Sequence, residues 1–105
     1  MLNQIVVVGR ITRLGSFDKA RDEFGIINIA VPRAFKNLNG EYETDFIDIE
    51  VPKNMMESCV EFCQRGDLVS VKGRIENLFQ NNERHLKVVA EKVTFLSSNN
   101  RRIEE

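Results

Sequence analysis

Stretches in which apolar and polar residues alternate recur along this chain and predict strands in five places. Residues 44–51 show the alternation most cleanly, because apolar side chains fall on one face and acidic side chains, together with Phe46, fall on the other. The other predicted strands cover residues 4–13, 24–36, 67–75 and 85–96. The first strand is apolar on both faces around Val6 and Val8, which is more hydrophobic surface than one small barrel needs and favours a subunit interface.

One segment follows a helical period instead of an alternation. Pro52 precedes it, apolar residues recur at helical spacing from Met55 to Cys63, and Gly66 follows it. These signals predict a single amphipathic helix of about three turns. We expect its methionines to pack on the core, rather than to line a binding groove.

Turn signals separate the predicted strands. Asn39-Gly40 is the strongest of them, because both residue types accept the positive φ values of a tight hairpin, and residues 80–84 predict a second turn. Pro32 cannot donate to a strand ladder, so we expect a sheet edge or a bulge there. Phe17 lies in a predicted loop, and its ring is either an anchor under that loop or an exposed stacking surface.

The order of elements is three strands, one helix and two strands, with Gly9 and Gly73 inside strands where the chain must bend or approach another backbone closely. This order predicts an all-β fold, a five-stranded oligonucleotide-binding (OB) Greek-key barrel with one helix between strands 3 and 4. A four-stranded sheet with two helices is the competing architecture, but only one helix is visible. We expect one OB domain over residues 1–96 and a short polar tail over residues 97–105.

Composition places the chain among soluble single-domain proteins. Hydrophobic residues make up 42% and charged residues 30%, and no apolar run approaches the ~20 residues that a membrane span needs. The start lacks the features of a signal peptide, so we expect a cytoplasmic protein. The net charge is −1, but residues 41–68 carry eight Asp or Glu against two Lys or Arg, which leaves the other strands free to present a basic stripe.

Candidate catalytic and metal-binding groups are few. The only histidine is His85, and Cys59 and Cys63 lie one helical turn apart, where they lack two further metal ligands and have poor geometry for a disulfide. We expect both thiols to be buried. Asp48 and Glu50 share a strand face and could act as the carboxylate pair of a hydrolase, but nothing indicates the burial that would tune them, so solvated charges are favoured. We expect no enzyme activity, no metal and no cofactor.

Basic and aromatic side chains lie near one another on the predicted strands and turns. Bases of a flexible single strand stack on aromatic rings, while Lys and Arg contact the phosphates. Each residue alone is weak evidence, since Lys72 and Arg74 on a plain solvated face would look the same. As a set on an OB-like order of elements, they favour nucleic-acid binding. The residues that we expect to contact the nucleic acid are Arg10, Arg33, Phe35, Lys36, Phe46, Lys72, Arg74, Phe79 and Arg84.

Five short motifs, in the right order, resemble bacterial single-stranded DNA-binding proteins. They are residues 1–12, the hairpin from Phe35 to Asp48, Gln64-Arg65-Gly66, Val71–Ile75 and Ala90–Leu96. The resemblance is colinear from Met1 to Leu96. It implies an OB fold, usually a homotetramer with a dimer as the other possibility, that coats single-stranded DNA without strong sequence preference in replication, recombination and repair, in a cytoplasmic, nucleoid-associated location.

The resemblance also assigns roles to residues. Phe35 and Phe46 match aromatics that stack bases, and Phe79 falls within one residue of a third. The arginines at or beside polar positions of the DNA path are Arg10, Arg33 and Arg74. Pro52 is a departure, because it stands where the family commonly has an aromatic, and its presence removes one stacking platform.

A second departure lies at the C-terminal end of the chain. The sequence stops at Glu105 without the acidic tip, ending in Pro-Phe, that recruits repair and replication proteins in this family. We therefore expect DNA binding without that recruitment. The alternative is a protein-interaction or assembly module of the primosomal type, small and without a tail on the same fold, which the acidic segment 41–68 and the missing tip both motivate.

Overall fold

The computed structural model describes residues 1–97, which fold into five strands and one helix. The strands are β1 (Ile5–Leu14), β2 (Phe24–Lys36), β3 (Tyr42–Pro52), β4 (Leu68–Gln80) and β5 (Glu83–Ser97), and helix α1 (Lys53–Phe62) lies between β3 and β4. The strands form a closed barrel in the order β1-β2-β3-β5-β4, in which only the β3–β5 pairing is parallel. This arrangement is an OB fold and confirms the predicted architecture.

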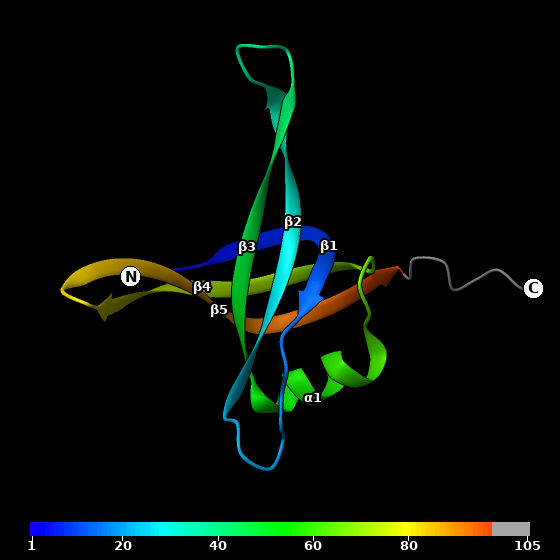
Figure 1. Cartoon of the computed structure of the whole chain (residues 1–105), viewed down its shortest axis with the longest axis vertical. Coiled ribbons are helices and arrows are strands. Elements are labelled where there is room, and N and C mark those ends of the chain that lie inside the picture. The colour runs from blue at the N-terminus through cyan, green and yellow to red at the C-terminus, as the bar shows by residue number, and fades with distance from the viewer. Residues whose placement is uncertain (98–105) are drawn as a thin grey trace, which may run out of the picture.

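Two long hairpins extend beyond the barrel (Figure 1). The β2–β3 hairpin rises at one end, the β4–β5 hairpin projects to the side, and α1 lies at the end opposite the β2–β3 hairpin. No helix in the described region is long and apolar enough to cross a membrane. Ser97 is the last residue of β5, so the predicted tail begins inside a strand, and its remainder, residues 98–105, lies outside the described residues.

Strand β1 closes the barrel by pairing with two different strands. Its first half pairs with β4, from Ile5 opposite Gly73 to Arg10 opposite Leu68, and its second half pairs with β2 from Arg10 onward. A Cβ on Gly9 would overlap the carbonyl oxygen of Ala30 on β2, and one on Gly73 would overlap the carbonyl oxygen of Val89 on β5. Both glycines therefore permit the close backbone approach that the sequence predicts.

Alternate residues of the strands fill the interior with branched aliphatic side chains. The fully buried ones include Ile11, Ile27, Ile29, Ile49, Val51, Val69 and Val71. From α1, Met56 and Cys59 are also fully buried, which confirms that the methionine stripe packs on the core. The apolar face of the helix is narrower than expected, because Val60 and Phe62 are exposed.

Neither cysteine forms a disulfide within residues 1–97, and both are buried, as predicted. Burial, with smaller effects from neighbouring Cys63, raises the pKa of Cys59 to about 12, so this thiol stays protonated and unreactive at neutral pH. Phe17 is partly buried and packs against the core, which supports its interpretation as an anchor under the loop that joins β1 and β2.

The two hairpin turns differ from the expectation in one respect. At the tip of the β2–β3 hairpin only Gly40 has a positive φ, of 80°, whereas Asn39 does not. The side chain of Asn37 shapes this turn, because its Oδ1 accepts hydrogen bonds from the backbone N–H of Asn39 and of Glu41. The turn with two positive φ values is instead the β4–β5 turn, formed by Asn81 and Asn82.

Candidate functional site

The outer surface of β1, β2 and β3 carries Phe46, one of the three aromatic residues predicted to stack on bases. Register places Phe46 opposite Ala30, and Ala30 in turn opposite Arg10. Because Ala30 is small, it leaves the neighbouring ring open, and Phe46 is 66% exposed. Arg10 lies in the same row, where its Nη1 donates to the carbonyl oxygen of Gly66 at 3.0 Å. The row thus presents one accessible aromatic ring beside an anchored guanidinium.

A chain of polar side chains forms the next row of this surface. Thr12 Oγ1 donates to Asn28 Oδ1, and Asn28 Nδ2 donates to Asp48 Oδ1 at 2.8 Å. Arg13 Nη2 lies 3.8 Å from the same oxygen of Asp48. Asp48 is therefore held by an amide and approached by a guanidinium. Nothing in this environment makes it a base or a nucleophile.

The β2–β3 hairpin presents Phe35 through an irregularity in its ladder. Pro32 lies opposite Thr44 and Lys36 lies opposite Tyr42, so β2 residues 33–35 face the single β3 residue Glu43. Of the two alternatives predicted at Pro32, a sheet edge or a bulge, the structure shows a bulge, and Phe35 within it is 76% exposed. Lys36 Nζ lies 5.8 Å from the ring centroid of Tyr42, within cation–π range.

Arg33 is bound to acidic side chains of the same hairpin. Its Nε and Nη2 donate to the two carboxylate oxygens of Asp45 at 3.0 and 2.9 Å, and its Nη1 donates to Glu43 Oε1 at 2.9 Å. The hydrogen bond from Arg33 lowers the pKa of Asp45, and the same contact raises the pKa of Arg33. A phosphate that contacts Arg33 must therefore compete with two carboxylates.

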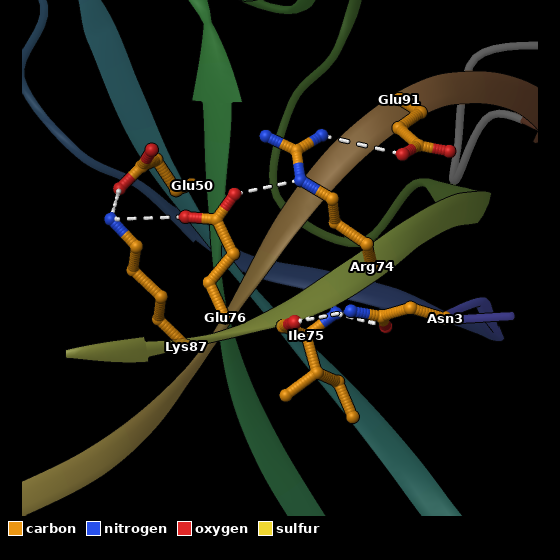
Figure 2. Close-up of polar contacts among 7 residues, drawn as sticks. All are labelled: Asn3, Glu50, Arg74, Ile75, Glu76, Lys87 and Glu91. Carbon is orange, nitrogen blue, oxygen red and sulfur yellow. Dashed lines mark hydrogen bonds and ion pairs between the residues drawn. The ribbon is translucent and has the colours of Figure 1, made fainter. Parts of the chain in front are cut away.

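Arg74 belongs to a charged network that joins β3, β4 and β5 (Figure 2). Its Nε donates to Glu76 at 2.7 Å and its Nη1 to Glu91 at 3.3 Å, while Lys87 Nζ lies 3.2 Å from Glu50 and 3.8 Å from Glu76. The hydrogen bond from Arg74 lowers the pKa of Glu76. Glu50 is therefore a partner of Lys87 rather than half of a carboxylate pair with Asp48.

The β4–β5 hairpin presents the third predicted aromatic. Phe79 lies opposite Arg84 and is 65% exposed. Arg84 and Lys72 have no ion-pair partner within residues 1–97. Lys72 lies beside Val6 on β1 and Lys92 on β5, which is a different part of the barrel surface from the Phe46 row.

The structure thus divides the predicted set of nine residues. Three aromatics are exposed in three places, and two cations have no ion-pair partner within residues 1–97. Arg33 and Arg74 are bound to carboxylates, Arg10 is bound to a carbonyl, and Lys36 lies over a ring. The sequence interpretation missed Asn28 and Phe24, which share the outer face of β2 with Ala30. The signal for both was their place in the apolar–polar alternation of β2. For Phe24 this signal is weak, because the first residue of a strand has no alternating residues before it. Within the described residues, no group of three or more His, Cys, Asp or Glu side chains could hold a metal ion.

Comparisons with known proteins agree with this geometry. Residues 2–96 match the Single-strand binding protein family. Single-stranded DNA-binding protein B of Bacillus subtilis is 34% identical over 95 residues, which cover 89% of this chain and 84% of that protein. Single-stranded DNA-binding protein 1 of Lactococcus lactis is 35% identical over 106 residues, which cover 94% and 71%.

Two solved structures are similar in fold. One is a Plasmodium falciparum SSB complex with ssDNA, with a TM-score of 0.68 and 17% identity over 92% of this chain and 96% of that one. The other is the dimeric N-terminal domain of PriB protein from Thermoanaerobacter tencongensis, with a TM-score of 0.63 and 21% identity over 91% and 98%. At these identities the two structures are evidence for the fold alone.

Proposed function

Because the chain belongs to the single-strand binding protein family, we propose that it binds and protects single-stranded DNA in replication, recombination or repair. Binding is tolerant of sequence, since it relies on stacking, and every base has a flat face. The observation that carries the proposal is the open ring of Phe46 beside Ala30 on the barrel surface, with Phe35 and Phe79 exposed on the two hairpins.

Stacking supplies more of the affinity in this proposal than phosphate contacts do. Arg33 and Arg74 already bind carboxylates, whereas Lys72 and Arg84 are unpaired within the described residues. Each phosphate that a protein neutralises on a single strand adds about −0.7 to the slope of log affinity against log salt. We therefore propose a real but shallow dependence of affinity on salt.

Titration of labelled oligothymidylate at two salt concentrations tests the proposal. We expect Phe46→Ala and Phe35→Ala each to weaken binding roughly 5- to 150-fold, because stacking contributes ~1–3 kcal/mol per base. Phe62→Ala is the matched control, since Phe62 is exposed to a similar degree on α1. Parent-like affinity in both of the first two variants would overturn the proposal, as would affinity that does not fall with added salt.

We further propose that the protein acts as a homo-oligomer, with a tetramer favoured and a dimer as the other possibility. The support is that Val6 and Val8 project outward from β1 with 59% and 46% of their surfaces exposed. Residues 5–9 of β1 also pair with β4 on one side only, because pairing with β2 begins at Arg10. An apolar face beside a free strand edge is well suited to pairing with a second copy.

We infer that the chain acts by binding and not by catalysis. Asp48 and Glu50, the candidate carboxylate pair, are each committed to another side chain. The alternative hypothesis, an assembly module of the primosomal type, is supported by the acidic segment 41–68. The similarity to the PriB domain adds no support, because it is evidence for the fold alone. The cytoplasmic, nucleoid-associated location follows in this proposal from DNA being the ligand.

A further inference from the structure

Phe24 is an exposed aromatic residue on the same outer face as Phe46. It is the first residue of β2, it is 47% exposed, and alternation along β2 places it on the side of Asn28 and Ala30 while Gly25, Ile27 and Ile29 point inward. Its cross-strand neighbour is Pro52, whereas the neighbour of Ala30 is Phe46. Phe24 precedes Ala30 by six positions, so the rings of Phe24 and Phe46 lie in rows about 20 Å apart along the strand.

A groove connects this position with the polar row of the barrel surface. It has a volume of about 700 Å³, and Phe24 lines it together with Arg13 and Asp48 from that row and Arg21 from the loop before β2. The groove therefore begins where the Asn28–Asp48 row ends. A DNA strand that runs from Phe46 along β3 would pass Asp48 and Arg13 and then reach the groove beside Phe24.

The groove combines a ring with two weakly engaged guanidiniums. Arg13 lies 3.8 Å from its acidic partner and 65% of its side chain is exposed. The guanidinium of Arg21 has no hydrogen bond or ion pair within residues 1–97. The groove is also lined by three carboxylates, those of Asp22, Glu23 and Asp48, which outnumber the two guanidiniums. The charge of the groove does not favour a phosphate, so the contribution to binding must come from the ring.

We propose that Phe24 is a further base-stacking platform, and that this groove takes one nucleotide of a bound single strand at a position beyond Phe46. The base stacks on the ring of Phe24, so any of the four bases can occupy this position. The platform stands directly across the ladder from Pro52, which offers no aromatic face. This inference rests on the proposed function.

Fluorescence provides a direct test, because the chain contains no tryptophan. The Phe24→Trp variant carries a single indole, and we expect oligothymidylate to quench its emission and affinity to be retained. Phe24→Leu keeps an apolar side chain but removes the π-face, so we expect it to weaken binding roughly 5-fold or more. Circular dichroism establishes that each variant is folded.

Oligonucleotide length separates this platform from the others. Across a series spanning the ~4–16 nucleotides that one OB fold covers, Phe46→Ala weakens binding at every length, whereas Phe24→Leu weakens it only for strands long enough to reach the groove. We expect the ratio of parent affinity to Phe24→Leu affinity to be the same at two salt concentrations, because stacking on the ring involves no charged group. In the Phe24→Ala background, Pro52→Phe restores part of the lost affinity, because the new ring lies on the same face.

The outcomes distinguish the two proposals. An unquenched indole in Phe24→Trp, together with parent-like binding by Phe24→Leu while Phe46→Ala is weakened, overturns the role of Phe24 and leaves single-stranded DNA binding in place. Parent-like binding in the Phe24, Phe35 and Phe46 variants alike overturns the proposed function itself. A loss in Phe24→Leu that is equal at all lengths also counts against the groove, because it indicates a general structural effect.

Discussion

Gly9 lies where β1 changes partners from β4 to β2, and the closure of the barrel depends on its missing side chain. We expect Gly9→Ala to lower the free energy of unfolding by roughly 1–3 kcal/mol, because the new Cβ meets the backbone carbonyl of Ala30, which cannot move without disturbing the β1–β2 ladder. Urea unfolding followed by circular dichroism, at one fixed protein concentration, measures the change.

Gly25→Ala is a matched control for that substitution. Gly25 is also a buried strand glycine, but the Cβ built on it meets the side chain of Met56, whose flexible thioether can shift. A smaller loss is expected. Equal losses in the two variants, or a parent-like midpoint for Gly9→Ala, would show that backbone approach at Gly9 is not what limits substitution.

At the scale of elements, the β2–β3 hairpin is held by Arg33 beneath its turn. Arg33 lowers the pKa of Asp45 below its ordinary value of 3.8. The contribution of this pair to stability is therefore fully present at neutral pH and is lost only as the pH falls below that value, through the folded pKa. We expect Arg33→Gln to raise the pKa of Asp45 toward its ordinary value, which carboxyl NMR titration measures.

The network on β4 supplies the control for this prediction. Arg74→Gln should raise the pKa of Glu76, whose ordinary value is 4.5, and leave that of Asp45 unchanged, since the two arginines contact different carboxylates. If the carboxylate of Asp45 titrates identically in the parent and in Arg33→Gln, the bidentate pair does not persist in solution.

The sequence predicts those parts of the fold that depend on local patterns, and it does not predict contacts that depend on strand register. The strand order, the helix and the roles of Gly9 and Gly73 follow from periodicity and from single-residue geometry. The pairing of Arg33 with Asp45 does not, because it depends on register around a bulge. The hairpin turn lies at Asn39-Gly40 as predicted, but only Gly40 takes a positive φ, because the side chain of Asn37 accepts hydrogen bonds from the backbone of this turn. Phe24 was missed because its significance depends on what lies across the ladder.

At the scale of the whole molecule, the proposed assembly into oligomers rests on the apolar outer face of β1. Val8 lies beside Ser70, and Val6 lies beside Lys72, so the exposed valines form a strip along the first half of β1 next to β4. A charge placed in the centre of an apolar interface loses its hydration without gaining a partner, which is strongly unfavourable. This strip is therefore the position where one substitution should separate subunits.

We expect Val8→Asp to convert the parent oligomer into smaller species in sedimentation velocity, with and without oligothymidylate. Val60→Asp is the matched control, because Val60 is exposed to a similar degree on α1, away from the strip. We expect Val8→Asp to fold, because Val8 is 46% exposed in the single chain, and circular dichroism checks this. A parent that sediments as a monomer, or an unchanged mass for Val8→Asp, would show that the subunits do not meet through β1.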